Sequence, residues 1–120
     1  MTPEEVEALV RKEIELFHYE PPEPGTTLGR PWSTEKVQGY VQKLRGALVK
    51  PYLQNFIPMD TYEQIQEKKT VQYWVVAEFD GHCEFYDPDN NEFGLAEMFI
   101  DKIPQTIGVR GDLVSTFCAY

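Results

Sequence analysis

The sequence lacks any hydrophobic stretch approaching the roughly 20 residues that a helix needs to cross a bilayer. Its first residues, MTPEEVEALV, are acidic and do not have the basic and then apolar layout of a secretory signal peptide. Histidine and cysteine are both scarce, with two residues each. We therefore expect a cytoplasmic protein that has no membrane partner.

The two cysteines, Cys83 and Cys118, do not form a CxxC pair, and both lie in apolar sequence. A disulfide requires an oxidising compartment, which nothing in the sequence indicates. Free thiols of this kind usually pack as small hydrophobic side chains, so we expect both to be buried and reduced. Cys83 also lies among acidic residues, which disfavour the thiolate and make it a poor nucleophile.

Basic residues are absent from a long C-terminal stretch. The chain holds 11 Lys and Arg against 20 Asp and Glu, a formal net charge of −9. Between Val71 and Asp101 there is no basic residue, whereas eight acidic residues are interleaved with aromatic ones. Nucleic acids are bound mainly through cations that replace their counterions. We therefore expect no nucleic-acid partner, and the charge favours a basic protein surface instead.

The motifs of common enzymes are missing too. There is no GxSxG, GxGxxG, P-loop or HExxH pattern. The DPDNN sequence at 87–91 resembles the start of a calcium loop, but Glu92 and Met98 stand where that loop needs Gly and Glu. We expect no metal, no cofactor and no catalytic residue. One acid–base hypothesis stays open, because His82 and Glu84 lie two residues apart and share one face of a strand.

Helix signals fill the first half of what we expect to be a single domain over residues 1–120. A Thr-Pro-Glu-Glu start and apolar residues at three- and four-residue spacing predict a helix over 3–18. Ser33 caps a second predicted helix over 34–49, which Pro51 ends or extends briefly. The proline-rich segment 20–32 predicts a surface loop, and Asp-Thr-Tyr-Glu at 60–63 predicts another helix start.

Strand-forming residues dominate from residue 70 onward. TVQYWVVAEF and HCEFY predict strands near 70–79 and 82–87, joined by a type I′ turn at Asp80-Gly81. EFGLAEMF predicts a third strand and the tail GDLVSTFCAY a last one. The expected fold is α+β, with N-terminal helices packed on a C-terminal antiparallel meander of three to four strands. The residues expected in its core include Val6, Val10, Ile14, Val41, Leu44, Leu48, Trp74, Val76 and Phe85.

The register of this hairpin decides which aromatic residues share a face. A two-residue turn pairs Phe79 with His82 and Ala77 with Glu84, and a regular ladder then pairs Val75 with Tyr86. Tyr73, Phe79 and Tyr86 would lie on one face. Both faces carry large apolar residues, although an antiparallel sheet usually wets one of them. We therefore predict a partner-binding face made of Tyr73, Phe79, His82, Glu84, Tyr86, Asp87, Asp89 and Glu92.

The sequence thus predicts a non-enzymatic binding or regulatory module that meets a basic protein partner through its acidic, aromatic C-terminal sheet. Reversing the charges at Glu84, Asp87, Asp89 and Glu92 should then slow association with the partner, reduce its salt dependence and leave the fold intact. Two alternatives stay open. One is a small-ligand pocket between the helices and a curved sheet, enzymatic or not, that uses His82, Glu84 and nearby tyrosines. The other is a homodimer formed through the apolar sheet face.

Overall fold

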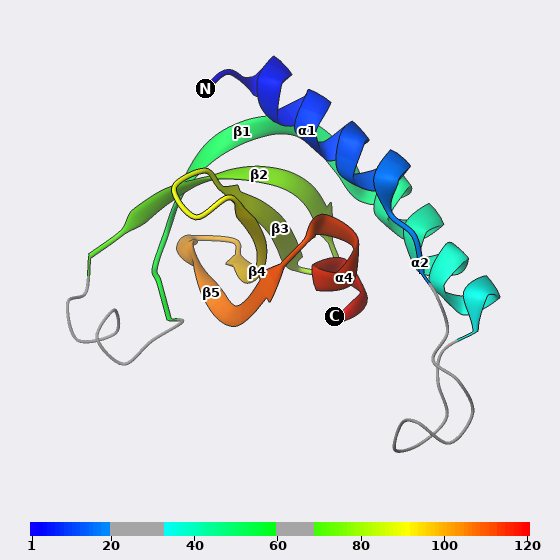
Figure 1. Ribbon diagram of the computed structural model, residues 1–120. Coiled ribbons are helices and arrows are strands. Elements are labelled where there is room, and N and C mark those ends of the chain that lie inside the picture. The colour runs from blue at the N-terminus through cyan, green and yellow to red at the C-terminus, as the bar shows by residue number, and fades with distance from the viewer. Residues whose placement is uncertain (20–32, 60–68) are drawn as a thin grey trace.

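The structure is a computed structural model that describes residues 1–19, 33–59 and 69–120 (Figure 1). Its helices and strands follow in the order α1 (Pro3–Leu16), α2 (Thr34–Ala47), β1 (Leu48–Phe56), β2 (Val71–Phe79), β3 (His82–Asp87), β4 (Glu92–Phe99), β5 (Lys102–Gly111) and α4 (Leu113–Cys118). The predicted α+β class is confirmed, with five strands rather than three to four. The predicted loop at 20–32 and the predicted helix start at 60–63 lie outside the described residues. None of the described helices is long and apolar enough to cross a membrane.

The two N-terminal helices begin where their capping residues predict. The Thr2 hydroxyl accepts a hydrogen bond from the Glu5 amide at 3.2 Å, and Ser33 accepts one from Lys36 at 3.1 Å. Each helix then buries one apolar stripe against the rest of the protein. The stripes consist of Val6, Val10 and Ile14 in α1 and of Val37 and Leu44 in α2. Of the predicted core residues, Val41 and Leu48 are only half-buried.

β1 corrects the expectation that the second helix runs to residue 49 or beyond Pro51. The chain turns into a strand at Leu48, and this strand pairs with β2. Pro51 is compatible with a strand here because the register shifts between Leu48 and Tyr52, and a bulge in an edge strand does not need the missing amide. The predicted hairpin of β2 and β3 is confirmed, with positive φ at both turn residues, Asp80 (45°) and Gly81 (73°).

The five strands form one antiparallel sheet in sequence order, and this sheet curls until its two edges meet. In a meander of five strands the first and the last run in the same direction, so their contact must be parallel. Ile57, just after β1, indeed forms a parallel bridge with Gln105 of β5. The Ile57 amide donates to the Pro104 carbonyl at 2.8 Å, and the Thr106 amide donates to the Ile57 carbonyl at 3.1 Å. Figure 1 shows β5 curling back beneath β1 and β2.

The curl gives the sheet two faces with separate cores. The inner face holds a cluster without any helix residue: Phe56, Tyr73, Val75, Cys83, Phe85 and Ala96. The outer face packs against α1, α2 and α4 through residues such as Trp74, Val76, Tyr86 and Phe93. Both faces are therefore covered from within the chain, which explains why the sheet sequence does not alternate between apolar and polar residues.

The C-terminal tail is a helix, so the prediction of a last strand there is wrong. The Asp112 side chain accepts a hydrogen bond from the Ser115 amide at 3.1 Å and caps α4. Leu113, Val114 and Phe117 of this helix are buried. α4 packs against α1, α2 and β4, which brings the C-terminal residues beside the N-terminal helices (Figure 1).

Candidate functional site

The eight residues predicted to bind a partner do not form one surface. Four of them are buried, with exposed fractions of 7% for Tyr73, 0% for Glu84, 4% for Tyr86 and 1% for Asp87. Phe79, His82 and Glu92 are half-buried, and Asp89 alone is exposed. The partner-binding set therefore divides into core residues and surface residues, and only the surface residues are accessible to another molecule.

A β-bulge separates the aromatic residues that were predicted to share a face. Ala77 pairs with Glu84 as expected, but the register then shifts and Val75 pairs with Phe85 instead of Tyr86. Beyond this bulge every side chain of β2 points to the opposite face from the one predicted. Tyr73 consequently stacks on Phe85 at the inner face, with ring centroids 4.6 Å apart.

Asp87 stabilises the turn between β3 and β4 and is not available to a partner. Its carboxylate accepts hydrogen bonds from the amides of Asp89 (3.0 Å) and Asn90 (3.3 Å), and from the Asn90 side chain (2.8 Å). It also accepts one from the Arg110 guanidinium at 3.0 Å. That guanidinium lies 5.2 Å from the Tyr73 ring centroid and 5.1 Å from that of Phe85. Because Asp87 is buried in this network, the premise that it is an exposed residue of the turn is wrong, and we now expect charge reversal at Asp87 to destabilise the fold.

Phe79 and His82 belong to an aromatic cluster at the end of the β2–β3 hairpin. The Phe79 ring contacts the rings of Phe117 in α4 and of Tyr120 edge to face, with centroid distances of 4.9 Å and 5.0 Å. The centroids of the His82 and Tyr120 rings are 4.7 Å apart, and His82 Nδ1 lies 2.9 Å from the Asp80 carbonyl oxygen. The C-terminal residue therefore covers the hairpin end, a contact that the predicted final strand did not suggest.

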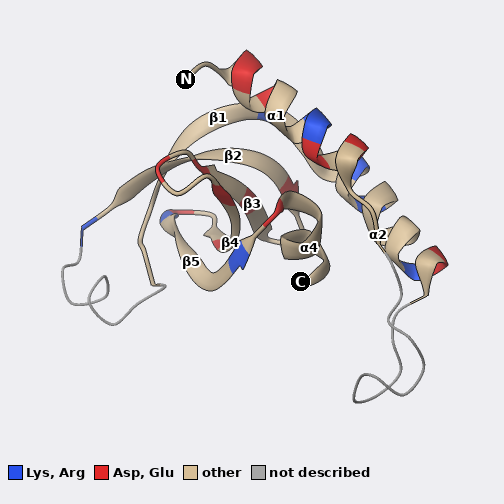
Figure 2. Ribbon diagram, in the orientation of Figure 1, with Lys and Arg blue, Asp and Glu red and all other residues tan. Residues whose placement is uncertain are grey.

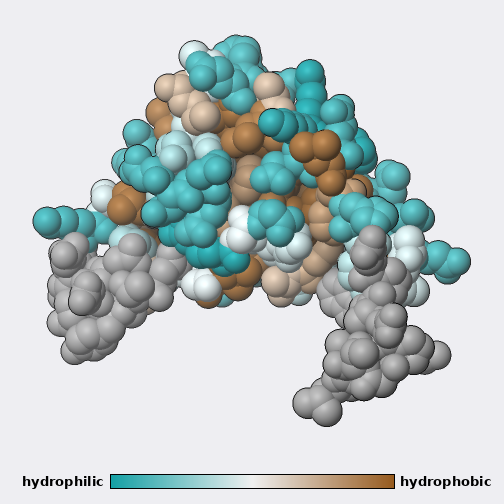
Figure 3. All heavy atoms as spheres, viewed as in Figure 1, coloured by the Kyte–Doolittle hydropathy of each residue, from teal (hydrophilic) through white to brown (hydrophobic). Residues whose placement is uncertain are grey.

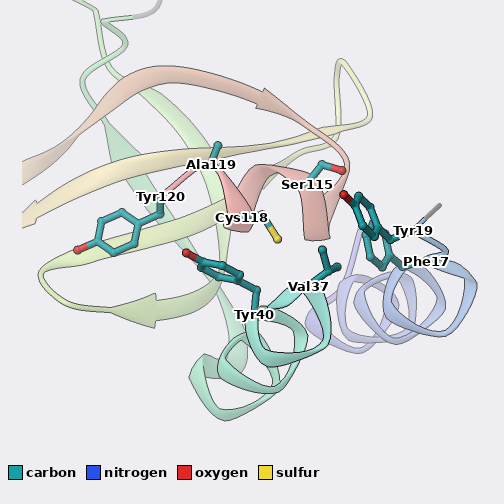
Figure 4. A pocket seen from close by; sticks show the side chains of 8 residues that line it. All are labelled: Phe17, Tyr19, Val37, Tyr40, Ser115, Cys118, Ala119 and Tyr120. Atoms are coloured by element: carbon teal, nitrogen blue, oxygen red, sulfur yellow. The ribbon is translucent and has the colours of Figure 1, made fainter. Parts of the chain in front are cut away.

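Two hollows lie beside this cluster and share two lining residues, and we call the pair the aromatic groove. One hollow has a volume of about 470 Å³ and is walled by the end of α1, by α2 and by α4, as Figure 4 shows. The other has about 380 Å³ and lies between α2 and the β2–β3 hairpin. Tyr40 and Tyr120 line both hollows. The first is otherwise lined by Phe17, Tyr19, Val37, Ser115, Cys118 and Ala119, and the second by Lys43, Gly46, Ala47, Glu78, Phe79, Asp80 and Phe117.

Figure 3 shows hydrophobic surface, in brown, beside α4 on the side of the molecule that this view presents. The walls of the groove combine aromatic and apolar side chains with tyrosine hydroxyls, and charged side chains lie at the hairpin end. Such a surface combines large apolar area with single hydrogen-bonding groups, which is the composition that small-molecule and peptide sites share. Tyr40 is a half-buried residue of α2. Of the residues predicted to bind a partner, Phe79 lines this groove, whereas Tyr40 and Tyr120 were not among them.

Acidic side chains lie at the hairpin end of the groove. Glu78 and Asp80 are both exposed, and the Tyr52 hydroxyl donates a hydrogen bond to Glu78. This bond, after burial as the larger cause, raises the pKa of Tyr52, so its hydroxyl stays protonated. Lys43 is the basic residue at this hollow, and its ammonium lies 5.6 Å from the Tyr40 ring centroid. Figure 2 shows red segments without blue ones along β2 and β3, whereas α1 and α2 carry both colours.

Glu84 is buried on the outer face of the sheet, opposite to the inner-face residues Cys83 and Phe85 that flank it in β3. Neither of its carboxyl oxygens has a hydrogen-bond partner among the described residues. His82 and Glu84 therefore do not form the hydrogen bond that the acid–base hypothesis requires. Burial, and then the charges of Asp112 and Glu13, raise the pKa of Glu84 well above its ordinary value. No set of three or more His, Cys, Asp and Glu side chains in residues 1–19, 33–59 and 69–120 is placed to hold a metal ion.

No protein-family model matches the chain, no curated protein matches it and no solved structure matches it.

Proposed function

We propose that the protein is a non-enzymatic binding module that takes a basic, aromatic-anchored segment of a protein partner into the aromatic groove. The observation that carries this proposal is that Tyr40 and Tyr120 line both hollows, so the same two aromatic side chains border two places where side chains of a partner could bind. This proposal keeps the predicted class of function and moves the contact surface from the sheet face to the groove.

The charge around the groove supports a basic partner. Glu78 and Asp80 are exposed at the hairpin end, and the chain carries a formal net charge of −9. A cationic segment would be attracted over a distance and would find carboxylates and ring faces together at the groove, a combination that binds Arg and Lys side chains. Aromatic and apolar anchors of the segment would occupy the hollow between Phe17 and Cys118.

The test selects binders from a displayed library of random peptides. We expect enrichment of peptides with Arg or Lys next to aromatic or aliphatic residues, because charge and apolar area act together. Tyr120→Ala should raise the dissociation rate of these peptides by about tenfold or more, as loss of an aromatic anchor does. If the Tyr120→Ala and Tyr40→Ala variants both bind these peptides as tightly as the wild type does, the proposal is contradicted.

A matched pair of charge reversals tests the acidic end of the groove. Asp80 and Asp89 are both exposed and lie in the turns at opposite ends of β3. Asp80→Lys should slow association and weaken its salt dependence, because peripheral charges act mainly on the rate of encounter. Asp89→Lys changes the net charge equally and should have a much smaller effect. If both variants behave alike, the net charge rather than the groove attracts the peptide.

The size of one hollow favours a second candidate, a small-ligand site. A volume of about 470 Å³ lies within the range of roughly 300–1,000 Å³ that is usual for small-molecule pockets. Ser115 is exposed and lines this hollow without lining the hairpin end. Ser115→Trp should therefore abolish binding of a small molecule detected by native mass spectrometry, while peptides that use the Phe79 end still bind.

Location and self-association complete the proposal. Cys83 and Cys118 are both free, which suits a reducing compartment, and we propose the cytoplasm. A homodimer would place a second copy of the chain over the groove. Sedimentation velocity of the wild type and of Tyr120→Ala separates that case from the peptide case, because only a dimer through the groove changes its mass with this substitution.

A further inference from the structure

Glu84 is a fully buried carboxyl group that the proposed binding function does not use. It lies in the middle of β3, and its neighbours on the adjoining strands are Ala77 of β2 and Leu95 of β4, neither of which has a polar side chain. Its exposed fraction is 0%, and neither oxygen accepts a hydrogen bond from a described residue. A buried carboxylate without a partner is strongly unfavourable, whereas the neutral acid is much less so.

Among the described residues, the charged groups that act on Glu84 are acidic. Glu13 of α1 and Asp112, the N-cap of α4, both disfavour its ionised form. Glu84 in turn contributes to the raised pKa of two thiols, Cys118 in α4 and Cys83 in β3. Lys12 acts on Glu13, and His18 lines a surface hollow together with Glu13 and Asp112. Tyr86 is the next residue of β3 on the same face, and Glu13 is one of the charges that raise its pKa.

We propose that Glu84 is a proton-dependent latch that holds α1 and α4 on the sheet when it is neutral and releases them when it is charged. A charge at Glu84 reaches water only if the helices above it move away, and the repulsion from Glu13 and Asp112 acts in the same direction. On release the proton passes to the solvent. In the opposite direction, uptake of one proton restores the closed arrangement.

The latch would control the aromatic groove. α4 contributes Ser115 and Cys118 to its wall, and Phe17 and Tyr19 follow directly after α1. Release of these helices would separate the two walls, so groove binding would weaken as the pH rises. This last step rests on the proposed function, whereas the latch itself does not.

The protonation state can be measured directly by infrared spectroscopy. We expect the carbonyl band of a protonated carboxylic acid in the wild type at neutral pH, and we expect Glu84→Gln to lack it. Absence of the band in the wild type at neutral pH overturns the latch, because a carboxylate that is already charged cannot be released by a further rise in pH.

Two substitutions in α1 provide a matched control. Glu13→Gln removes one of the charges that act on Glu84, so the pH at which the band disappears should fall. Glu15→Gln removes the same charge from an exposed position two residues further along and should leave that pH unchanged. An equal effect of both variants would show that the net charge, not the contact with α1, controls Glu84. These variants also test the latch if Glu84→Gln does not fold.

The movement is measured by hydrogen exchange corrected for its intrinsic pH dependence. The relevant pH range begins at the ordinary glutamate pKa of 4.5 and ends where the carboxylic acid band disappears. Within this range, protection of the α1 and α4 amides should fall about tenfold per pH unit, because opening releases one proton. Protection in Glu84→Gln should stay constant. If the sheet amides lose protection to the same level as the helix amides, the whole protein unfolds and the latch is wrong. No partner is needed, so failure of the groove proposal leaves this result intact.

Discussion

The ring of Phe85 covers Gly94 on the neighbouring strand. The two residues are cross-strand partners at the inner face, and a Cβ built on Gly94 would lie 2.9 Å from Phe85 Cε2 and closer still to Cζ. The ring is held in place by Tyr73 on one side and by Phe56, whose centroid is 5.0 Å away. Glycine is therefore required here by the close approach of an aromatic ring that has no free space beside it.

Gly94→Ala should destabilise the fold by about 1–3 kcal/mol, the usual cost of overpacking a core. Denaturant unfolding followed by tryptophan fluorescence measures this change. Gly46→Ala is the control, because a Cβ at this helical glycine meets nothing within 4 Å. That variant should be neutral or slightly stabilising, since alanine is favoured over glycine within a helix. A neutral Gly94→Ala would mean that Phe85 has another rotamer available.

Leu44→Ala should cost about 2–5 kcal/mol, because this side chain of α2 is fully buried and its removal leaves a cavity. Gln42→Ala, at an exposed position of the same helix, should change the free energy of unfolding by less than about 0.5 kcal/mol. Chemical denaturation of both variants makes the comparison. A small effect at Leu44 would contradict the packing of α2 on the outer face.

The helices and the central hairpin were predictable because their signals are local. Caps at Thr2 and Ser33 and the Asp80-Gly81 turn each act within a few residues. The two edge strands were missed because both contain a proline, at Pro51 and Pro104, and a proline is tolerated there only through the sheet context. In α4 the Asp112 cap favours a helix, whereas the β-branched and aromatic residues that follow favour a strand. Packing against α1 and α2 stabilises the helix.

The candidate site was predictable only in part. A one-residue bulge between Val75 and Ala77 reverses the orientation of Tyr73, and no residue type in β2 marks that bulge. Phe79 does lie in the groove, but its partners Tyr40 and Tyr120 are far away in the sequence. Their approach depends on how α2 and α4 pack on the sheet, which follows from the whole fold rather than from any local pattern.

Both thiols should react slowly with a thiol reagent in the folded protein. Burial, and then the charges of Glu78 and Glu84, raise the pKa of Cys83 from 9.0 to about 12, which lowers its thiolate fraction near neutral pH by about a thousandfold. Cys118 is half-buried and should react first, although burial raises its pKa too. Mass spectrometry of the labelled protein measures both rates. Rapid labelling of native Cys83 would contradict its place in the inner core.

Asp87→Ala should cost about 3 kcal/mol, because it removes the nearer carboxylate of a largely buried ion pair and leaves the Arg110 guanidinium with Glu92 at 3.8 Å. The turn amides of Asp89 and Asn90 lose their acceptor as well. Asp89→Ala, in the same turn but exposed, should be neutral within about 0.5 kcal/mol. Thermal unfolding of the two variants tests whether this turn is structural, as we conclude, or a free acidic surface.

Glu84 should make the protein less stable as the pH rises. Its pKa is raised in the folded state relative to the value of 4.5, so between these two pKa values the folded protein binds one more proton than the unfolded chain. The free energy of unfolding then falls with increasing pH, by up to about 1.4 kcal/mol per pH unit. Below 4.5 both states are protonated, and the stabilising contribution of the neutral acid is fully present.

Urea unfolding at a series of pH values, for the wild type and for Glu84→Gln, measures this contribution as the difference between two curves. Acidic groups that do not interact with Glu84 titrate equally in both proteins, so their effects cancel. We expect Glu84→Gln to be similar to the wild type near the lower end of the series and more stable at neutral pH. The opposite sign, with the variant less stable at neutral pH, would mean that the Glu84 carboxylate is charged and stabilised by a partner in the folded protein.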